Sequence, residues 1–314
     1  RCFRNEGLSL KHNPEFTTIE FYWAYATYHN LMDFTEDLIT GLARDVIKSE
    51  VIRFGDHDIN LKGPYARLTM REAVAKYTNS TMDQVNDRNH LLGLLKGIDM
   101  DPKKLNELSW GKLLVLAFEE KVEAQLIQPT FITDYPIEMS PLCKKHRDNP
   151  ELTERFELMI NGKEIANAYS ELNDPIDQRE RFEEQMSLSE KGDDEAMFID
   201  QDFLRALEYG MPPTSGMGIG IDRLVMLLTN NISIQEVLFF PQMRPETKIV
   251  KVELNDSEKI IFETMKELKE LQLFQLKEKF EMSNKVWDTS IKTLTKHNLI
   301  KVTKELEELW VRLS

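Results

Sequence analysis

The chain has 314 residues, of which 41% are hydrophobic and 9% aromatic, enough to build sizeable cores and to exclude disorder as its dominant state. Charged residues make up 30% of the chain, and no apolar run approaches the ~20 residues that a membrane-spanning helix needs. The formal net charge of −14 repels polyanions on average, so any contact with nucleic acid has to be local.

The length predicts about two domains. Two cysteines that lie far apart, Cys2 and Cys143, predict neither a disulfide framework nor a metal-ligand cluster. This usage is typical of a reducing compartment, so we expect a cytoplasmic protein without a membrane partner. The chain opens on Arg1 without methionine or a secretory leader, and we therefore expect a fragment of something longer.

Alternation with period two over residues 16–22 predicts a strand. We expect residues 1–6 to be its partner, across a loop of residues 7–15. One face of this strand would carry Phe16, Thr18, Glu20 and Tyr22.

A helical pattern covers residues 33–50, with its first turn expected at residues 35–37. A short strand is expected near residues 51–54. Residues 70–128 are predicted to be helical, and Thr69 with Glu72 forms a capping box at their start.

Residues 129–138 are β-rich and bounded by prolines, which predicts a buried strand. Two further strands, 155–160 and 163–171, flank Asn161-Gly162, the strongest short hairpin signal. A charged helix is expected over residues 174–187. The glycine-rich stretch 216–220 predicts a strand that leads into an apolar helix.

The predicted hairpin brings two carboxylates together. A two-residue turn pairs Met159 with Glu164 and Glu157 with Ala166, so the two glutamates become diagonal neighbours ~7–8 Å apart. Two carboxylates held together are costly unless a proton or a cation intervenes, and hard oxygen ligands favour Mg²⁺. At this stage a solvated hairpin face explains the pair equally well.

Two further motifs are weak in isolation. Arg4 and Glu6 lie two residues apart on one strand face, where a surface ion pair is the alternative explanation. The pattern Gly-x-Gly-x-Gly-x-x-Arg of residues 216–223 places Arg223 at a helix start, where the backbone can approach a ligand closely. A tight corner is the alternative there.

Taken together, three long stretches resemble one family. They are FRNEGLSLKHNPEFTTIEFY at 3–22, ERFELMINGKEIANAYSELNDP at 154–175 and GMGIGIDRLVMLLTN at 216–230. In this order and spacing they are similar to the catalytic domain of class II lysyl-tRNA synthetases. The resemblance covers residues 1–245. It implies an α+β fold, with a mostly antiparallel sheet and flanking helices, that activates L-lysine with ATP and charges tRNA(Lys).

The resemblance also implies an ATP site. Arg4, which bridges the lysine carboxylate and the α-phosphate, and Arg223, which grips the γ-phosphate, are the expected catalytic residues. Glu6 would read the adenine amino group and Phe16 would stack on adenine. The family usually has arginine where Lys11 stands. The compact ammonium charge of lysine therefore replaces the planar, forked donors of a guanidinium group there. The loop over the nucleotide would hold Lys11, His12 and Asn13, and the magnesium pair would be Glu157 and Glu164.

For lysine, the resemblance implies that Glu20 and Glu171 hold the ammonium group, because an unpaired buried charge is costly. The remaining residues of this pocket would be Tyr22, Asn167, Tyr169 and Gly216. Strict alternation along residues 163–171 would place Glu164 on the face opposite Glu171. Since the family site needs both, we predict a β-bulge between Glu164 and Asn167.

The family's anticodon-binding OB domain and its first motif, which builds the dimer interface, would precede Arg1. We therefore expect a homodimer in the full-length protein, and a fragment that need not be active by itself. Two alternatives stay open: a synthetase-like ligase that attaches lysine to a protein, and a non-catalytic paralogue.

Composition changes after residues 241–245, and residues 246–314 are predicted to form a C-terminal appendage. Its expected helices, 257–271, 274–280 and 284–297, and a hairpin of 299–302 with 309–313 resemble a winged helix in their order. Trp287, Ile291 and Leu294 are expected in its core. An RNA contact and a solvated face are the two alternatives for Lys285, Lys292 and Lys296.

Overall fold

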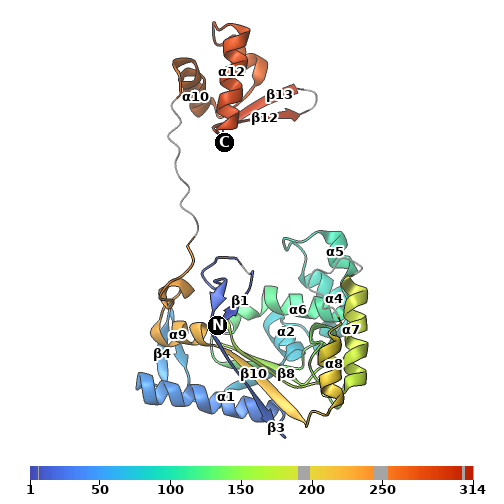
Figure 1. The fold of residues 1–314 in the computed structure, drawn as a ribbon. Coiled ribbons are helices and arrows are strands. Elements are labelled where there is room, and N and C mark those ends of the chain that lie inside the picture. The colour runs from blue at the N-terminus through green and yellow to red at the C-terminus, as the bar shows by residue number, and fades with distance from the viewer. Residues whose placement is uncertain (6, 190–198, 244–253, 306–307, 314) are drawn as a thin grey trace. The chain divides into compact units, whose positions relative to one another are not determined.

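The computed structural model describes residues 1–5, 7–189, 199–243, 254–305 and 308–313. They fall into two units, Arg1–Arg244 and Pro245–Ser314, each of which is described by itself (Figure 1). In the described part of the chain, no helix is long and apolar enough to cross a membrane.

A six-stranded sheet organises the first unit. Its strand order is β3-β10-β9-β8-β7-β6, and every neighbouring pair is antiparallel except β6 with β7. The prediction of a mixed, mostly antiparallel sheet is therefore confirmed. The strands are β3 (Thr18–Ala24), β6 (Ala66–Thr69), β7 (Thr130–Thr133), β8 (Arg155–Met159), β9 (Glu164–Ser170) and β10 (Thr214–Gly220).

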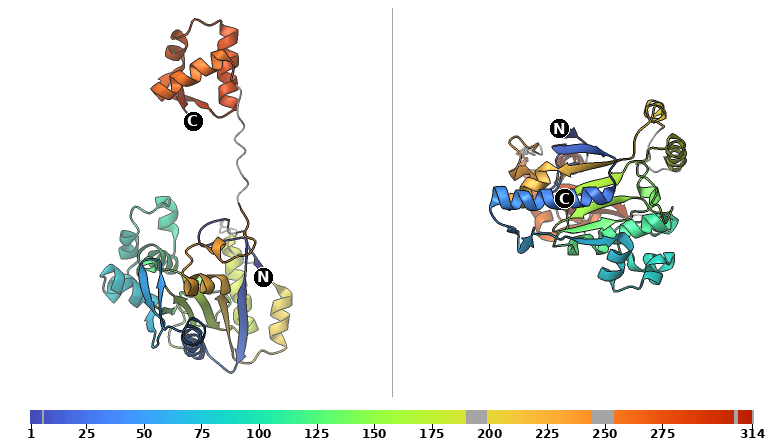
Figure 2. Two further views of the ribbon diagram at one scale, coloured as in Figure 1. Left: turned by 90° about the vertical axis from the view of Figure 1, so that its left-hand side faces the viewer. Right: turned by 90° about the horizontal axis from the view of Figure 1, so that it is seen from below.

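Two apolar layers cover this sheet. α1 (Tyr28–Leu42) and α9 (Ile221–Thr229) pack Leu31 and Leu224 against Phe156 and Met217 on one face. The helices of residues 70–121 pack against Ile132 and Met159, which point the other way. In the orientation of Figure 1, α1 lies below the sheet and these helices lie above it (Figures 1 and 2). On β3 and β9, Glu20, Asn167 and Tyr169 line a cavity beside the sheet.

The helical region begins at the predicted capping box. The backbone N–H of Thr69 donates to Glu72 Oε2 at 2.9 Å, and that of Glu72 donates to Thr69 Oγ1 at 3.1 Å. The helices that follow are α2 (Met70–Thr78), α3 (Met82–Asn86), α4 (Arg88–Leu94), α5 (Pro102–Glu107) and α6 (Trp110–Lys121).

The first long helix starts earlier than predicted. α1 begins at Tyr28, after Thr27 in a capping box with Asn30, and a π-helical turn over Ala43–Ile47 continues it. Thr35 is fully buried within the helix, and its hydroxyl donates to the carbonyl of Leu31 at 2.6 Å. The expected first turn at residues 35–37 was wrong because the hydroxyl of Thr35 is satisfied inside a helix rather than at its cap.

The N-terminal strand is also split. In the described residues β1 (Cys2–Phe3) pairs with β2 (Glu15–Phe16) and not with β3. Between β2 and β3, the N–H of Thr17 donates to Asp222 Oδ2 at 2.6 Å instead of to a strand. Elsewhere β4 (Val51–Phe54) confirms the predicted strand 51–54. The buried strand predicted over residues 129–138 is present only as β7, whose four residues are all buried, and a 3₁₀ turn over Ile137–Met139 follows it. β5 (His57–Asn60) pairs with β4.

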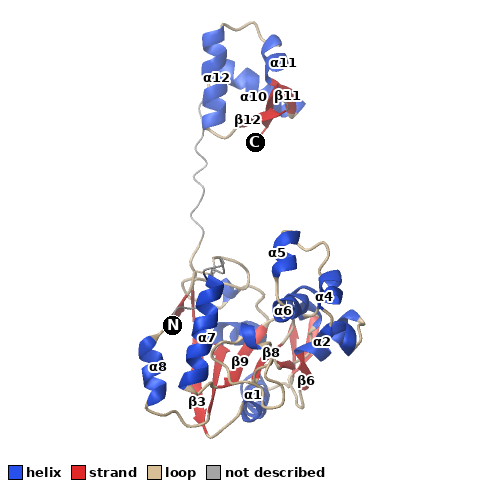
Figure 3. Ribbon diagram, turned by 90° about the vertical axis from the view of Figure 1, so that its right-hand side faces the viewer, coloured by secondary structure: helices blue, strands red, loops and turns tan. Residues whose placement is uncertain are grey.

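Two helices form one side of the first unit. α7 (Pro175–Ser189) matches the predicted charged helix, and α8 (Gln201–Glu208) lies beside it (Figure 3). Phe182 and Phe203 connect them, with ring centroids 6.1 Å apart.

The second unit has its own small core. Trp287 and Leu294 are buried in it and Ile291 packs against it, as predicted. β11 was not predicted, and the first helix ends at Leu268, before Lys269 at φ 60°, rather than at residue 271. The sheet order is β11-β13-β12, and the assignment to the winged helices stays a prediction. The elements are α10 (Asp256–Leu268), β11 (Glu270–Gln272), α11 (Leu273–Glu278), α12 (Asn284–Lys296), β12 (Ile300–Glu305) and β13 (Glu308–Leu313).

Candidate active site

The β8–β9 hairpin has the predicted turn and the predicted bulge. Ile160 and Lys163 exchange backbone hydrogen bonds of 2.9 and 3.1 Å around Asn161-Gly162, whose φ angles are both positive. Met159 then pairs with Glu164, but Leu158 pairs with Ala166, so Ile165 is the extra residue. This residue shifts the register, and Glu157 lies opposite Asn167 instead of Ala166 as expected.

The bulge brings both ends of β9 to one cavity. Glu164 lies before it and Asn167, Tyr169 and Glu171 lie after it, and all four line the same cavity of about 490 Å³. Strict alternation would have separated Glu164 from the other three. The bulge thus re-aims one strand so that it supplies carboxylates to two parts of one site.

Glycines form the floor of this cavity. Gly216 of β10 lies between Tyr22 and Tyr169, and Gly218 lies between Glu20 and Asn167. A Cβ atom on Gly216 would lie 2.7 Å from the ring of Tyr22 and closer still to the Glu171 carboxylate. A strand without side chains on this face therefore leaves room for a ligand beside the sheet.

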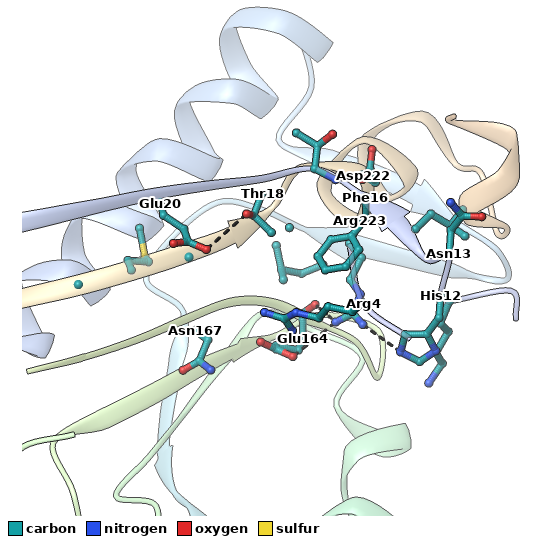
Figure 4. A pocket seen from close by; sticks show the side chains of 18 of the residues that line it. Arg4, His12, Asn13, Phe16, Thr18, Glu20, Glu164, Asn167, Asp222 and Arg223 are labelled. Carbon is teal, nitrogen blue, oxygen red and sulfur yellow. Dashed lines mark hydrogen bonds and ion pairs between the residues drawn. The ribbon is translucent and has the colours of Figure 1, made fainter. Parts of the chain in front are cut away.

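Cations occupy one end of the cavity (Figure 4). Arg223, in the first turn of α9, donates from Nη1 to the carbonyl of Glu164 at 3.0 Å, and its Nη2 lies 3.4 Å from His12 Nε2. The guanidinium carbon of Arg4 lies 5.4 Å from the ring centroid of Phe16. Asn13 is buried beside them. This end has the positive charge and the flat ring that a nucleotide requires.

Carboxylates occupy the other end, where Figure 4 shows Glu20 beside Thr18 and away from Arg4. Burial raises the pKa of Glu171 to about 7. Burial also raises the pKa of Tyr22, and the charges of Glu171 and Glu20 add to that shift. Among the described residues no ion pair joins Glu20 or Glu171 to a cation, so this end can accept a positively charged group.

A second cavity of about 320 Å³ adjoins the first and includes Glu157. Glu157 Oε1 lies 2.6 Å from Arg155 Nη2, and Arg155 also donates to Asn167 Oδ1 at 3.2 Å and to Ser140 Oγ at 2.9 Å. Burial raises the pKa of Glu164, and the charge of Glu157 raises it further. Glu164 also lines this cavity, so the hairpin brings both glutamates to one place, and their role as a magnesium pair stays a prediction.

Sequence reasoning missed two charged residues here. The first is Arg155, which forms an ion pair with Glu157. The second is Glu123, which belongs to a 3₁₀ turn over Glu123–Gln125 and lies 4.0 Å from the ammonium of Lys11. Burial raises the pKa of Glu123, whereas Lys11 lowers it. The position of Arg155, two residues before Glu157, was a weak signal of its role. The sequence around Glu123 carried no signal of a contact with Lys11.

The structure thus brings most of the predicted site residues together. Glu157 lines the adjoining cavity, and Glu6 lies outside the described residues. Among the residues that the structure describes, no three His, Cys, Asp or Glu side chains gather as a metal site. The predicted site residues that line the larger cavity are Arg4, Lys11, His12, Asn13, Phe16, Glu20, Tyr22, Glu164, Asn167, Tyr169, Glu171, Gly216 and Arg223.

Comparisons with known proteins agree on a family. The family model "tRNA synthetases class II (D, K and N)" matches residues 1–244. The lysine–tRNA ligase of Christiangramia forsetii is 57% identical over 312 residues, which are 99% of this chain and 54% of that ligase. The lysine–tRNA ligase of Porphyromonas gingivalis is 60% identical over 247 residues, which are 78% of this chain and 42% of that ligase. The chain spans about half the length of the curated relatives that it matches. It belongs to the class II tRNA synthetases of the D, K and N group.

Proposed function

We propose that this chain forms the catalytic core of a lysine–tRNA ligase, which activates L-lysine with ATP and transfers it to tRNA(Lys). The observation that carries the proposal is the polarity of the larger cavity, in which Figure 4 shows Glu20 at one end and Arg4 and Arg223 at the other. Glu171 belongs to the acidic end, because its charge and that of Glu20 both act on Tyr22. Lysine has an ammonium group at the tip of its side chain and a carboxylate at its α-carbon. It therefore fits between these ends with both charges compensated.

The cationic end suits ATP. Phe16 offers a ring for adenine, and Arg4 and Arg223 offer guanidinium forks to the phosphates. His12 and Lys11 line the same end and add donors there. The role of Glu6 in reading the adenine amino group stays part of the proposal from the family resemblance.

Activation joins the lysine carboxylate to ATP. A carboxylate oxygen forms a bond to the α-phosphorus, the bond from that phosphorus to the bridging oxygen of the β-phosphate breaks, and pyrophosphate leaves. A ribose hydroxyl of the tRNA then attacks the lysyl carbonyl, and AMP leaves. Arg4 and Arg223 supply positive charge where negative charge develops, so the chemistry depends on position and charge more than on a general base.

The residues present fit a magnesium ion. Glu157 and Glu164 line the adjoining cavity together with Arg223, and Mg²⁺ prefers one or two carboxylates together with substrate phosphates. When bound, the ion would neutralise phosphate charge. The residues that would hold it are Glu157 and Glu164.

Magnesium binding is expected to depend on the nucleotide. Two carboxylates, one of them already paired with Arg155, are too few ligands for tight binding of the ion alone. Titration calorimetry should show weak binding without ATP and much tighter binding with it. Tight binding without nucleotide would contradict the assignment of the pair.

A methyl group on Gly216 is expected to close the lysine pocket. It would meet the Tyr22 ring and the Glu171 carboxylate, so Gly216→Ala should raise the KM for lysine at least about tenfold with a smaller effect on the KM for ATP. Gly218→Ala is the matched control, because a Cβ atom there has ordinary contact with Glu20 at 3.7 Å. Equal KM values for the two variants would refute the tight fit.

The proposal includes a homodimer of the full-length protein and a cytoplasmic location. Support for the location is indirect: Cys2 and Cys143 are both free thiols, as in a reducing compartment.

The experiment that tests the function follows labelled pyrophosphate into ATP. We expect incorporation that depends on lysine, and transfer of lysine to tRNA(Lys) when that RNA is added. Exchange without amino acid preference would refute the lysine site. Lysine transfer to a protein instead of tRNA(Lys) would favour the synthetase-like ligase.

A further inference from the structure

The longest helices of the second unit differ in what they expose. α12 buries Trp287 and Leu294 in the core of the unit. At about 100° per residue, its opposite side carries four residues within about 60° of one another. They are Lys285, Thr289, Lys292 and Lys296, and all three lysines are exposed. Figure 3 shows α12 at the edge of the unit.

Charge is distributed unevenly between the units. Pro245–Ser314 contains 13 basic and 13 acidic residues, so the net charge of −14 lies entirely in Arg1–Arg244. Within the second unit, α10 has four acidic and two basic residues, whereas α12 has three lysines and only Asp288. The exposed face of α12 therefore carries three lysines, with Asp288 at its edge, and is a local surface of net positive charge on an acidic protein.

Acids compensate cations elsewhere in this unit. Lys266 Nζ lies 2.7 Å from Glu263 Oε1, and Arg312 Nη2 lies 2.8 Å from Glu270 Oε1. Within the described ranges, no ion pair is formed by Lys285, Lys292 or Lys296. Their Cα atoms span about 16 Å along the helix, a length that meets several phosphates of a nucleic acid.

We propose that this lysine face of α12 binds the phosphate backbone of RNA. Lysine is a point charge on a flexible stem, so it suits phosphate contacts that position an RNA without reading its sequence. The choice of RNA over DNA rests on the proposed function, because a ligase that charges tRNA meets that RNA in every cycle. The appendage would then add affinity for tRNA to a core whose net charge repels it.

The test compares two variants of the 314-residue chain that lose the same charge. One carries Lys285→Gln, Lys292→Gln and Lys296→Gln. The control carries Lys259→Gln, Lys266→Gln and Lys279→Gln, which removes three exposed lysines from elsewhere on the same unit. Glutamine forms helices about as well as lysine, so both variants should fold, which circular dichroism checks. The probe is a tRNA(Lys) transcript, measured by fluorescence anisotropy over a series of salt concentrations.

We expect the α12 variant to lose about tenfold in affinity. The slope of the logarithm of its binding constant against the logarithm of the salt concentration should become shallower by about two, since each lost phosphate contact removes ~0.7–0.9 from that slope. The control should stay within about twofold. Equal losses in both variants, or none, would overturn the proposal. Binding of a duplex DNA as tight as that of the tRNA would overturn the choice of RNA. Pyrophosphate exchange needs no RNA, so its failure would refute the proposed function and leave this surface standing.

Discussion

Replacing Glu171 by glutamine is expected to raise the KM for lysine about 100-fold. The carboxylate is partly buried beside Tyr22 and Gly216, where water compensates an unpaired ammonium poorly. Loss of one partner of a desolvated charge pair typically costs 2–5 kcal/mol, and about 2.7 kcal/mol corresponds to 100-fold. The KM for ATP should change little, because the phosphates lie at the other end of the cavity.

Glu157→Gln is the matched control for this experiment. It removes the same charge from the same hairpin but beside the cationic end, so it should act on ATP and magnesium more than on lysine. If Glu171→Gln raised both KM values equally, the assignment of the acidic end to the lysine ammonium would be wrong.

The same carboxylate predicts a pH dependence. Burial raises the pKa of Glu171 to about 7, so in the free site the carboxylate gains a proton as the pH falls through 7. The ammonium of lysine requires the ionised form. At saturating ATP, kcat/KM for lysine should therefore fall as the pH drops below about 7, approaching tenfold per pH unit. The inflection should vanish in Glu171→Gln, and its persistence there would assign it to another group.

Replacing Arg155 by alanine is expected to lower the free energy of unfolding of the first unit by about 3 kcal/mol. Arg155 and Glu157 are each about one-sixth exposed and lie 2.6 Å apart. Arg155 also stacks 4.4 Å from the ring centroid of Tyr135. Its removal leaves the Glu157 carboxylate without its partner and close to the charge of Glu164, and breaking a buried pair in this way typically costs 3–5 kcal/mol.

Urea unfolding measures this loss. The double variant Arg155→Met with Glu157→Leu should recover most of it, because apolar residues of similar volume replace a buried pair at little cost. A loss below about 1 kcal/mol in Arg155→Ala would show that solvent screens the pair, as it does at a protein surface.

Sequence reasoning predicted the site best along β9, where the alternation of a strand and the pattern of the family could not both be satisfied. Alternation along β9 and the family pattern could not both hold around Glu164 and Glu171, and the bulge at Ile165 is the resolution that the structure shows. The register beyond the bulge could not follow from the turn alone, because an extra residue moves Glu157 from Ala166 to Asn167. Local rules therefore predicted the hairpin, and only its tertiary setting fixed the pairing.

Residues whose partners are distant in the sequence were missed. Arg155 is held by Ser140 and Asn167 as well as by Glu157, and Glu123 approaches Lys11 from more than a hundred residues away. No period or spacing encodes such contacts. The start of α1 was missed for a local reason. From the sequence alone, a threonine that is buried inside a helix cannot be told from one that caps it.

The central claim is that the acidic end of the cavity recognises the ammonium group of lysine. Calorimetry with two stable adenylate analogues tests it most directly: lysyl sulfamoyl-adenosine and norleucyl sulfamoyl-adenosine, which lacks only the terminal ammonium. We predict that the lysyl analogue binds at least about 100-fold more tightly to the natural chain, and that Glu171→Gln removes most of this preference. Equal affinity of the natural chain for both analogues would contradict the account.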